Sequence, residues 1–557
     1  MSSLNRYFCT FAAENEVLSI YIQNYIKMKK YLILLATALL LGACASDDIP
    51  VGTQDSTQLA DVTIMYYDHG ATTLDGECIL NIRQMYQAEK SCYKNVKIAI
   101  EYKFSTLNHL PYNLYKYHSK EEMEEEFRKK MEKPEDYTDE TYITWMYPKG
   151  SSTFRFVLDP TKTLKQQADD NYLPGENADI TNPDSLTNFM NWVAKNCPAK
   201  KYVLILGDHG GGYMPHEEIY NDAKATTRGI MYDDGNNDKH FTALSLAHAI
   251  KAANIRPDVL FLDACLMNNM EYMFELKDVT DYIIASTFDL EFNIICTTMI
   301  ECVSGASENL KYAFEKYIEY ISKNYDNIMV NEVVYYNDLT MTETAKLDEL
   351  GKAMREFTDR LCNTYKYGTA EQKQRIDEVT KYAVKINKQR PLYDVARYME
   401  GIRRALPEVI DDEFWAELKA AFNNCIAAQY TGKYLQDHDY QVDYSVLMAT
   451  KGVYQQAGWK TTDDNVNTLI KLLYYEPDGN IISYKVTNGV FVNGVTPNYT
   501  LEEDRKENWG GTLQSVYSAL AFDKATGWSR WLLLNEQQPS LWCNNDFKIP
   551  LPDISDK

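Results

Sequence analysis

The chain has 557 residues, 45% hydrophobic and 25% charged, which is the composition of an ordinary globular protein with room for more than one core. Its 57 Lys and Arg against 80 Asp and Glu give a formal charge of -23, which argues against nucleic acids and anionic lipid surfaces as partners. A basic substrate is compatible with this charge, but charge alone does not select one.

A leader is predicted near the start of the chain. Met28, Lys29 and Lys30 precede an apolar run over residues 31–41, which is followed by small residues and Cys44. This order is typical of a signal peptide, and the run is too short for an ordinary membrane span. It resembles the lipobox of bacterial lipoproteins, which implies that Cys44 becomes the lipidated first residue.

Four expectations follow from the leader. Residues 1–27 are an upstream start artefact, residues 28–44 the signal peptide and residues 45–57 a flexible tether. The protein is then an outer membrane lipoprotein that faces the periplasm or the cell surface, and only the lipid on Cys44 attaches it to the membrane.

Strand and helix patterns alternate from residue 58 onward. Apolar runs predict strands at 62–67, 96–102, 153–158 and 282–286, and two further strands that end at His209 and Cys265. Amphipathic patterns predict helices at 79–88, 183–194, 243–253 and 268–277, the second with Asn182 as its cap and Pro183 in its first turn. Such alternation predicts an α/β fold, a mostly parallel sheet with helices on both faces.

The second half of the chain reads differently. From about residue 307 the pattern is more helical, with one strand at 332–336 and a helical stretch at 377–428 that is broken at Pro391 and Pro407. We therefore expect a core over residues 58–366 and a C-terminal accessory region, helical or α+β, over residues 367–557.

Eleven cysteines are scattered along the chain without a CxxC pair or a Cys and His pattern at zinc spacing. Cys265 and Cys44 have roles of their own, and Cys9 lies upstream of the expected start. Eight are expected to be small buried apolar residues: Cys78, Cys92, Cys197, Cys296, Cys302, Cys362, Cys425 and Cys543.

Cys265 and His209 are the candidate catalytic residues, because each ends an apolar strand where open α/β sheets place their active sites. A helix starting at Leu266 would favour the thiolate of Cys265, and His209 could protonate a departing amine. In the glycine-rich turn after His209, the amide of Gly210, together with that of Cys265, could bind a developing oxyanion.

The two blocks 208–212 (DHGGG) and 263–267 (DACLM), with Glu271 following, resemble the signature of the clostripain family of cysteine peptidases. Residues 63–67, 186–192 and 228–233 are similar as well, so the resemblance covers roughly residues 58–290. It implies a caspase-like fold for the core, a His209 and Cys265 dyad, and hydrolysis of protein or peptide substrates through a thioester.

The same resemblance implies a specificity pocket and a maturation step. Asp263 matches the aspartate at the base of the pocket in relatives that cleave after Arg or Lys. The next loop, which starts at Ser286, contributes to substrate binding, but its expected acidic position falls on Asn293; Asp289 or Glu291 could substitute. Self-cleavage between the blocks is also implied, and Lys224, Arg228 and Lys239 are available for it.

Several polar residues have competing interpretations. For Asp208 a turn-capping role is favoured over orientation of the loop, and His69, His216 and His240 are not expected to act. Residues 233–238 are interpreted as a solvated turn rather than a calcium loop, since the terminal Glu of such a loop is missing. No cofactor is expected to be required, and calcium is the only weak candidate.

The predicted function is that of a cysteine endopeptidase. Cleavage after Arg or Lys is a further expectation. The alternative is a surface lipoprotein that binds peptides or glycans on a degenerate peptidase fold, and the altered loop after Ser286 favours it. A transpeptidase or amidase would share the dyad.

Overall fold

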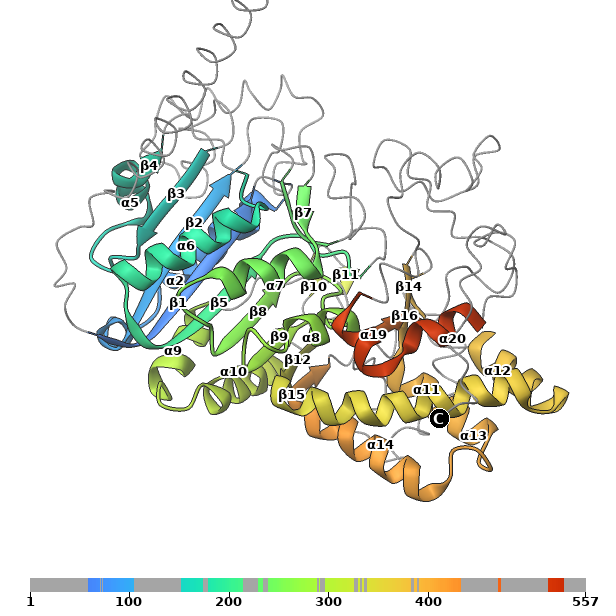
Figure 1. The fold of residues 1–557 in the computed structure, drawn as a ribbon. Helices are drawn as coiled ribbons and strands as arrows, with labels where there is room; N and C mark the ends of the chain where they lie inside the picture. Colours follow the sequence, from blue (N-terminus) through green and yellow to red (C-terminus); the bar gives the residue numbers. More distant parts are fainter. Residues whose placement is uncertain are drawn as a thin grey trace, which may run out of the picture. The chain divides into compact units, whose positions relative to one another are not determined.

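A nine-stranded mixed sheet is the centre of the described structure (Figure 1). Its strands lie in the order β15 (Ile426–Thr431), β12 (Asp338–Glu343), β9 (Tyr282–Ala285), β8 (Val259–Asp263), β5 (Ala199–Gly207), β1 (Ala60–Gly70), β2 (Val96–Phe104), β3 (Ser152–Val157) and β4 (Tyr172–Leu173). The five strands from β9 to β2 are parallel, and the strands outside them pair antiparallel. The predicted α/β class is confirmed.

The computed structural model describes residues 59–70, 72, 74–104, 152–173, 179–213, 229–233, 239–287, 290, 296–324, 329–330, 333–334, 338–381, 385–387, 390–431, 469–471 and 519–534. All of them belong to one compact unit, Asp55–Lys557. The signal peptide, the tether and the charged stretch before β3 lie outside the described residues. Within them, no helix is both long and apolar enough to cross a membrane.

Helices cover both faces of the sheet, because successive side chains of each buried strand point to opposite sides. In β1, Met65 and Tyr67 join one hydrophobic cluster, whereas Ile64 and Tyr66 join the other. The first cluster includes α6 (Pro183–Asn196), α7 (Ala243–Ala252) and α8 (Met270–Leu276). The second includes α2 (Asp75–Met85), α9 (Cys296–Gly305) and α10 (Leu310–Asn324).

The predicted helix start at residue 183 is confirmed. The side chain of Asn182 accepts a hydrogen bond from the amide of Asp184 at 2.9 Å, and Pro183 is the first helical residue. An Asn cap satisfies an amide that the helix itself cannot pair, and Pro lacks the amide that would otherwise be left over. These two residues therefore fix where α6 begins.

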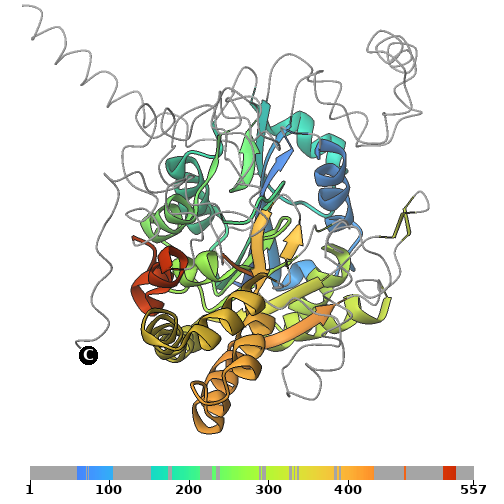
Figure 2. The same cartoon turned by 90° about the vertical axis from the view of Figure 1, so that its right-hand side faces the viewer.

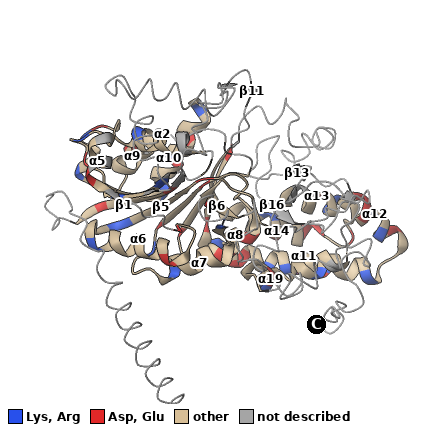
Figure 3. Cartoon of the chain, turned by 90° about the horizontal axis from the view of Figure 1, so that it is seen from above, with Lys and Arg blue, Asp and Glu red and all other residues tan. Residues whose placement is uncertain are grey.

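The first cluster also contains the helices of the C-terminal part. They are α11 (Leu347–Tyr367), α12 (Ala370–Lys381), α13 (Val395–Ala405), α14 (Asp412–Cys425), α19 (Ala521–Thr526) and α20 (Trp528–Leu534). Two views at right angles show α11 and α14 together beyond the β15 end of the sheet (Figures 1 and 2). Basic and acidic residues alternate along α11 and α12 (Figure 3). The predicted boundary after residue 366 falls inside α11, and one cluster continues on both sides of it.

Smaller elements complete the described chain. They are the helices α5 (Leu164–Asn171), Cys92–Lys94 and Thr344–Lys346, the hairpins β6 (Ile230–Asp233) with β7 (Lys239–Phe241) and β10 (Met329–Val330) with β11 (Val333–Val334), and a three-stranded sheet of β13 (Lys385–Asn387), β14 (Arg390–Asp394) and β16 (Leu469–Lys471).

The predicted breaks of the helical stretch 377–428 at Pro391 and Pro407 are confirmed, since both prolines lie between helices. The segment before α13 is not helical, however: Pro391 lies in strand β14, where its fixed φ suits extended backbone. Of the strand predicted at 332–336, the described residues Val333 and Val334 form β11, whereas β12, a strand of the central sheet, was not predicted. β12 was missed because three of its buried residues, Asp338, Thr340 and Thr342, are polar.

Six of the cysteines expected to be buried and apolar are buried free thiols: Cys78, Cys92, Cys197, Cys296, Cys362 and Cys425. Burial raises the pKa of Cys197, Cys362 and Cys425 to about 12. Cys302 is half-buried, and Cys543 lies outside the described residues. Cys197, Cys362 and Cys425 are therefore poor nucleophiles at neutral pH.

Trp528 tests whether the C-terminal helices are part of the core. Its side chain is fully buried and its ring meets Tyr398 edge-on, with centroids 6.2 Å apart. Trp528→Ala is expected to lower the free energy of unfolding by about 3–5 kcal/mol, measured by urea denaturation, because a large buried side chain is lost. Tyr367→Ala, at a site that is 57% exposed, should change it by no more than about 0.5 kcal/mol. Equal stability of both variants would contradict a docked α20.

Candidate active site

His209 and Cys265 emerge from neighbouring parallel strands. In the pairing of β5 with β8, Gly207 lies opposite Asp263. His209 comes two residues after Gly207, and Cys265 two residues after Asp263. A Cβ atom placed on Gly210 would lie 2.2 Å from the carbonyl oxygen and 2.8 Å from the amide nitrogen of Cys265. Only glycine fits there, and the contact brings the His209 loop directly against the backbone of Cys265.

Cys265 lies in a tight turn rather than at the first residue of a helix. Leu266 has a φ of 63°, and α8 begins only at Met270, with Asn269 as its cap. The predicted helix start at Leu266 was wrong, because Asn269 caps the helix later: its side chain accepts from the amide of Tyr272 and donates to the carbonyl of Leu266, both at 3.0 Å. The left-handed turn leaves Cys265 half-buried at the sheet edge.

A loop after β9 touches the sulfur. The amide of Leu290 donates a hydrogen bond to Sγ of Cys265 at 3.2 Å. Asp338 anchors the start of this loop, since its carboxylate accepts from the hydroxyl of Ser286 at 2.7 Å and from the amide of Thr287 at 2.9–3.0 Å. A donor aimed at the sulfur favours the thiolate over the thiol.

Ser286, predicted to bind substrate, is fully buried at the end of β9. Its hydroxyl donates to Asp338, and its carbonyl accepts from the amide of Asn268 at 2.8 Å. These bonds hold the start of the loop in place. Asn293, predicted for the same pocket, and the alternatives Asp289 and Glu291 lie outside the described residues.

His209 is half-buried and lies against β6. Its carbonyl accepts from the amide of Met231 at 3.0 Å, and its ring meets that of Tyr232 at 6.3 Å between centroids. Gly210 forms an isolated bridge with Ile230. The two hydrogen bonds of that bridge come from the amides of Gly211 and Met231, so the bridge itself does not use the amide of Gly210.

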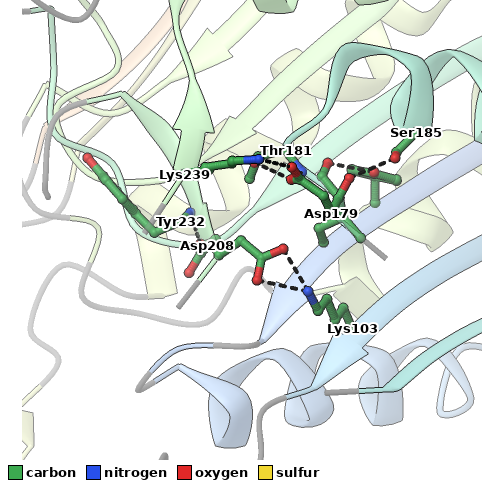
Figure 4. A network of polar contacts seen from close by, with 10 residues as sticks. Lys103, Asp179, Thr181, Ser185, Asp208, Tyr232 and Lys239 are labelled. Atoms are coloured by element: carbon green, nitrogen blue, oxygen red, sulfur yellow. Dashed lines mark hydrogen bonds and ion pairs between the residues drawn. The ribbon is translucent and has the colours of Figure 1, made fainter. Parts of the chain in front are cut away.

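Asp208 links the His209 loop to two distant segments. Its buried carboxylate accepts from the hydroxyl of Thr72 at 3.0 Å and from the amide of Tyr232, a residue of β6 (Figure 4). Burial raises the pKa of this carboxyl well above its usual range, against these hydrogen bonds. Asp208 also has a hydrogen bond with the backbone of His209, so it combines the local role that the sequence interpretation favoured with contacts that orient the loop.

Asp263 faces a second carboxylate across Gly207. A Cβ atom on Gly207 would lie 2.8 Å from Oδ1 of Asp68 and 3.6 Å from Oδ2 of Asp263. The register Asp68 to Gly207 to Asp263 puts both carboxylates in one row of the sheet. Burial, with a further contribution from Asp68, raises the pKa of Asp263 well above its usual range. Sequence reasoning missed Asp68, because only the strand register reveals it.

Other candidates have different surroundings. Asp233 is fully buried and pairs with Lys103, so the interpretation of 233–238 as a solvated turn was wrong for its first residue. Among the described residues, no group of three or more His, Cys, Asp and Glu side chains could hold a metal ion. Cys44, Lys224 and Arg228 lie outside the described part of the chain.

The chain is similar to several known proteins. The clostripain of Hathewaya histolytica is 31% identical over 106 residues, which are 18% of this chain and 19% of that protein, so the match spans about a fifth of that relative. A solved secreted cysteine protease of Bacteroides thetaiotaomicron is 15% identical, with 68% of this chain and 88% of that chain covered and a TM-score of 0.46. A solved inactive zymogen protease of Parabacteroides distasonis is 14% identical, with 84% of this chain and 99% of that chain covered and a TM-score of 0.45.

A family comparison covers much more of the chain. The model of the clostripain family matches residues 163–532, which include both signature blocks as well as the C-terminal helices. Since this match extends over more than half of its 557 residues, the chain belongs to the clostripain family.

Proposed function

We propose that the protein is a cysteine endopeptidase with Cys265 as nucleophile and His209 as general acid and base. The observation that carries the proposal is the contact of Gly210, the residue after His209, with the backbone of Cys265. It supports an arrangement in which both side chains lie at one edge of the sheet and a substrate carbonyl meets both. Membership of the clostripain family supports the same chemistry.

The reaction follows from the roles of the two residues. The Cys265 thiolate adds to the scissile carbonyl carbon, and the tetrahedral intermediate collapses as the C–N bond breaks and His209 gives a proton to the leaving amine. Water, which loses a proton to His209, then attacks the thioester. The new carboxylate leaves and Cys265 is free again.

Backbone amides at the site support this sequence of steps. The amides of Gly210 and Cys265 are the proposed donors to the oxyanion, and one such donor is typically worth about 3 kcal/mol in the transition state. The Leu290 amide, 3.2 Å from Sγ, stabilises the thiolate before attack. These steps use only groups of the chain and water, so we propose that the reaction requires no metal or cofactor.

Replacement of the nucleophile tests the proposal directly. Cys265→Ala should reduce cleavage of a mixed peptide library to background, a loss on the order of 10⁴-fold or more, because no thioester can form. The readout is mass spectrometry of all products from the chain that lacks residues 1–44. Cys302→Ala is the matched control, since Cys302 is the other described half-buried cysteine and lies in α9.

The outcomes of this experiment distinguish a peptidase from a binding lipoprotein. Activity lost in Cys265→Ala and kept in Cys302→Ala supports the peptidase. No cleavage by any variant, with Cys265 no more reactive to iodoacetamide than Cys302, would favour the binding lipoprotein instead.

We further propose that the pocket prefers a basic residue before the scissile bond. Asp263 and Asp68 place two carboxylates in one row beside Cys265, and Asp68 is fully buried. Carboxylates that line one side of a pocket attract a positively charged side chain, so a substrate Arg or Lys would be favoured there over an uncharged residue. Asp68 thus takes the part of the second acidic residue whose family position falls on Asn293.

Neutralisation of either carboxylate should weaken this preference. Asp263→Asn or Asp68→Asn is expected to lower the ratio of kcat/KM for Arg over Gln substrates at least about 10-fold, which corresponds to about 1.4 kcal/mol. Because the pKa of Asp263 is raised, the same ratio should fall as the pH drops through this raised pKa, where the carboxylate gains a proton. Asp278→Asn, an exposed carboxylate, is the control. A ratio unchanged in both active-site variants would refute the basic pocket.

The location of the enzyme is proposed from the leader. We propose that Cys44 carries the lipid that holds the protein in the outer membrane, with the peptidase on the periplasmic or cell-surface side, where it meets protein or peptide substrates. Cys44→Ser should move the protein from the membrane pellet to the soluble extracytoplasmic fraction, because the anchor is lost. The measurement is immunoblotting of fractions after metabolic labelling with a fatty acid; an unlabelled wild-type protein would contradict the anchor.

A further inference from the structure

A buried ion pair lies behind the His209 loop, outside the dyad itself. Nζ of Lys103, in β2, lies 2.8 and 2.7 Å from the two carboxylate oxygens of Asp233, the last residue of β6. Both side chains are fully buried. Burial lowers the pKa of Lys103, and the Asp233 carboxylate opposes this effect. Figure 4 marks the two contacts of the Lys103 Nζ by dashed lines.

Such a pair is a poor way to stabilise a fold. Two charges removed from water lose about as much hydration free energy as their attraction returns, so an apolar pair of similar volume often serves stability equally well. What the pair does provide is a fixed position, since each charge is strongly disfavoured without the other. The question is what the position of Asp233 determines.

Three consecutive residues of β6 are tied to the surroundings of His209. The amide of Met231 donates to the His209 carbonyl at 3.0 Å, and the amide of Tyr232 donates to the Asp208 carboxylate. Asp233 then pairs with Lys103. The His209 loop is therefore paired to a strand whose far end is fixed by the ion pair.

The backbone of β6 is also strained. Met231 has a φ of 63°, a left-handed conformation that side chains other than glycine rarely adopt. Such a conformation persists only where the neighbouring residues enforce it. Tyr232 and Asp233 are those neighbours on one side, and release of Asp233 would let Met231 relax and shift the carbonyl of His209.

We propose that the Lys103–Asp233 ion pair is a positioning device for the general acid and base: it fixes the end of β6, and β6 holds the backbone of His209 against Cys265. The inference rests on the proposed function, in which His209 acts on Cys265. Lys103 and Asp233 are positioning residues, because they act through β6.

Replacement of both charges separates position from stability. In Lys103→Met/Asp233→Leu no buried charge is left unpaired, so the variant should fold. We expect amide hydrogen exchange at Gly211 and Met231 to accelerate at least about 10-fold, since these amides bond the His209 loop to β6. We also expect kcat to fall on the order of 100-fold with KM within about two-fold, because a small misplacement of a catalytic group has this effect.

A third measurement follows the dyad without a substrate. The pH midpoint of Cys265 alkylation by iodoacetamide should rise in the double variant, because a displaced His209 no longer favours the thiolate. Lys200→Met is the matched control: it removes an exposed ion pair with Asp61, at 2.7 Å, between β5 and β1. All three measurements should stay at wild-type values in this control.

The outcomes distinguish the inference from the proposed function. A folded double variant with wild-type exchange and wild-type alkylation midpoint overturns the inference. If Cys265 of the wild type is unreactive, the proposed function fails, and hydrogen exchange alone decides the inference. If the double variant does not fold, Asp233→Asn decides, because it keeps the shape of the side chain but removes one charge of the pair, which leaves Lys103 uncompensated: slower turnover at constant KM supports positioning, and wild-type turnover overturns it.

Discussion

The register between β5 and β8 is the constraint on which the site depends. It sets Gly207 opposite Asp263, so the two strands end together and His209 and Cys265 follow at the same edge. A shift of the strand pairing by one residue would move every side chain of the shifted strand to the opposite face of the sheet and bury charges in the apolar clusters. The alternation of side chains between the two hydrophobic clusters therefore fixes the register that brings His209 and Cys265 to the same edge.

Around that register the structure holds each reactive residue by polar contacts from outside its own strand. Asn269 closes the turn after Cys265, Asp338 anchors the loop whose amide reaches the sulfur, and Asp208 ties the His209 loop to β6. Left-handed residues lie beside both members of the dyad, Met231 and Leu266. Strain beside a reactive group persists where the surroundings overdetermine the backbone, and preorganised sites have this property.

The sequence predicts the central strands well, because continuous apolar runs are a local signal, and the same runs locate His209 and Cys265 where they stop. It does not predict the contacts that depend on register. Asp68 lies 195 positions before Asp263, and only the order β1, β5, β8 brings them into one row. β12 was missed for a related reason, since Asp338 and its threonines are buried by pairing with β9 and β15 rather than by apolar periodicity.

The described C-terminal helices also contact the element that follows Cys265. α8, which follows the turn of Cys265, packs against α19: the Phe274 and Phe522 rings lie 5.3 Å apart, and the amide of Ala521 donates to the Glu275 carboxylate at 2.8 Å. Burial raises the pKa of Glu275, and the half-buried carboxylate loses a hydrogen bond if this donor is removed. Separation of α19 from α8 would remove that donor and loosen the helix that follows the turn of Cys265. The described C-terminal helices are thus packed against the element that supports this turn.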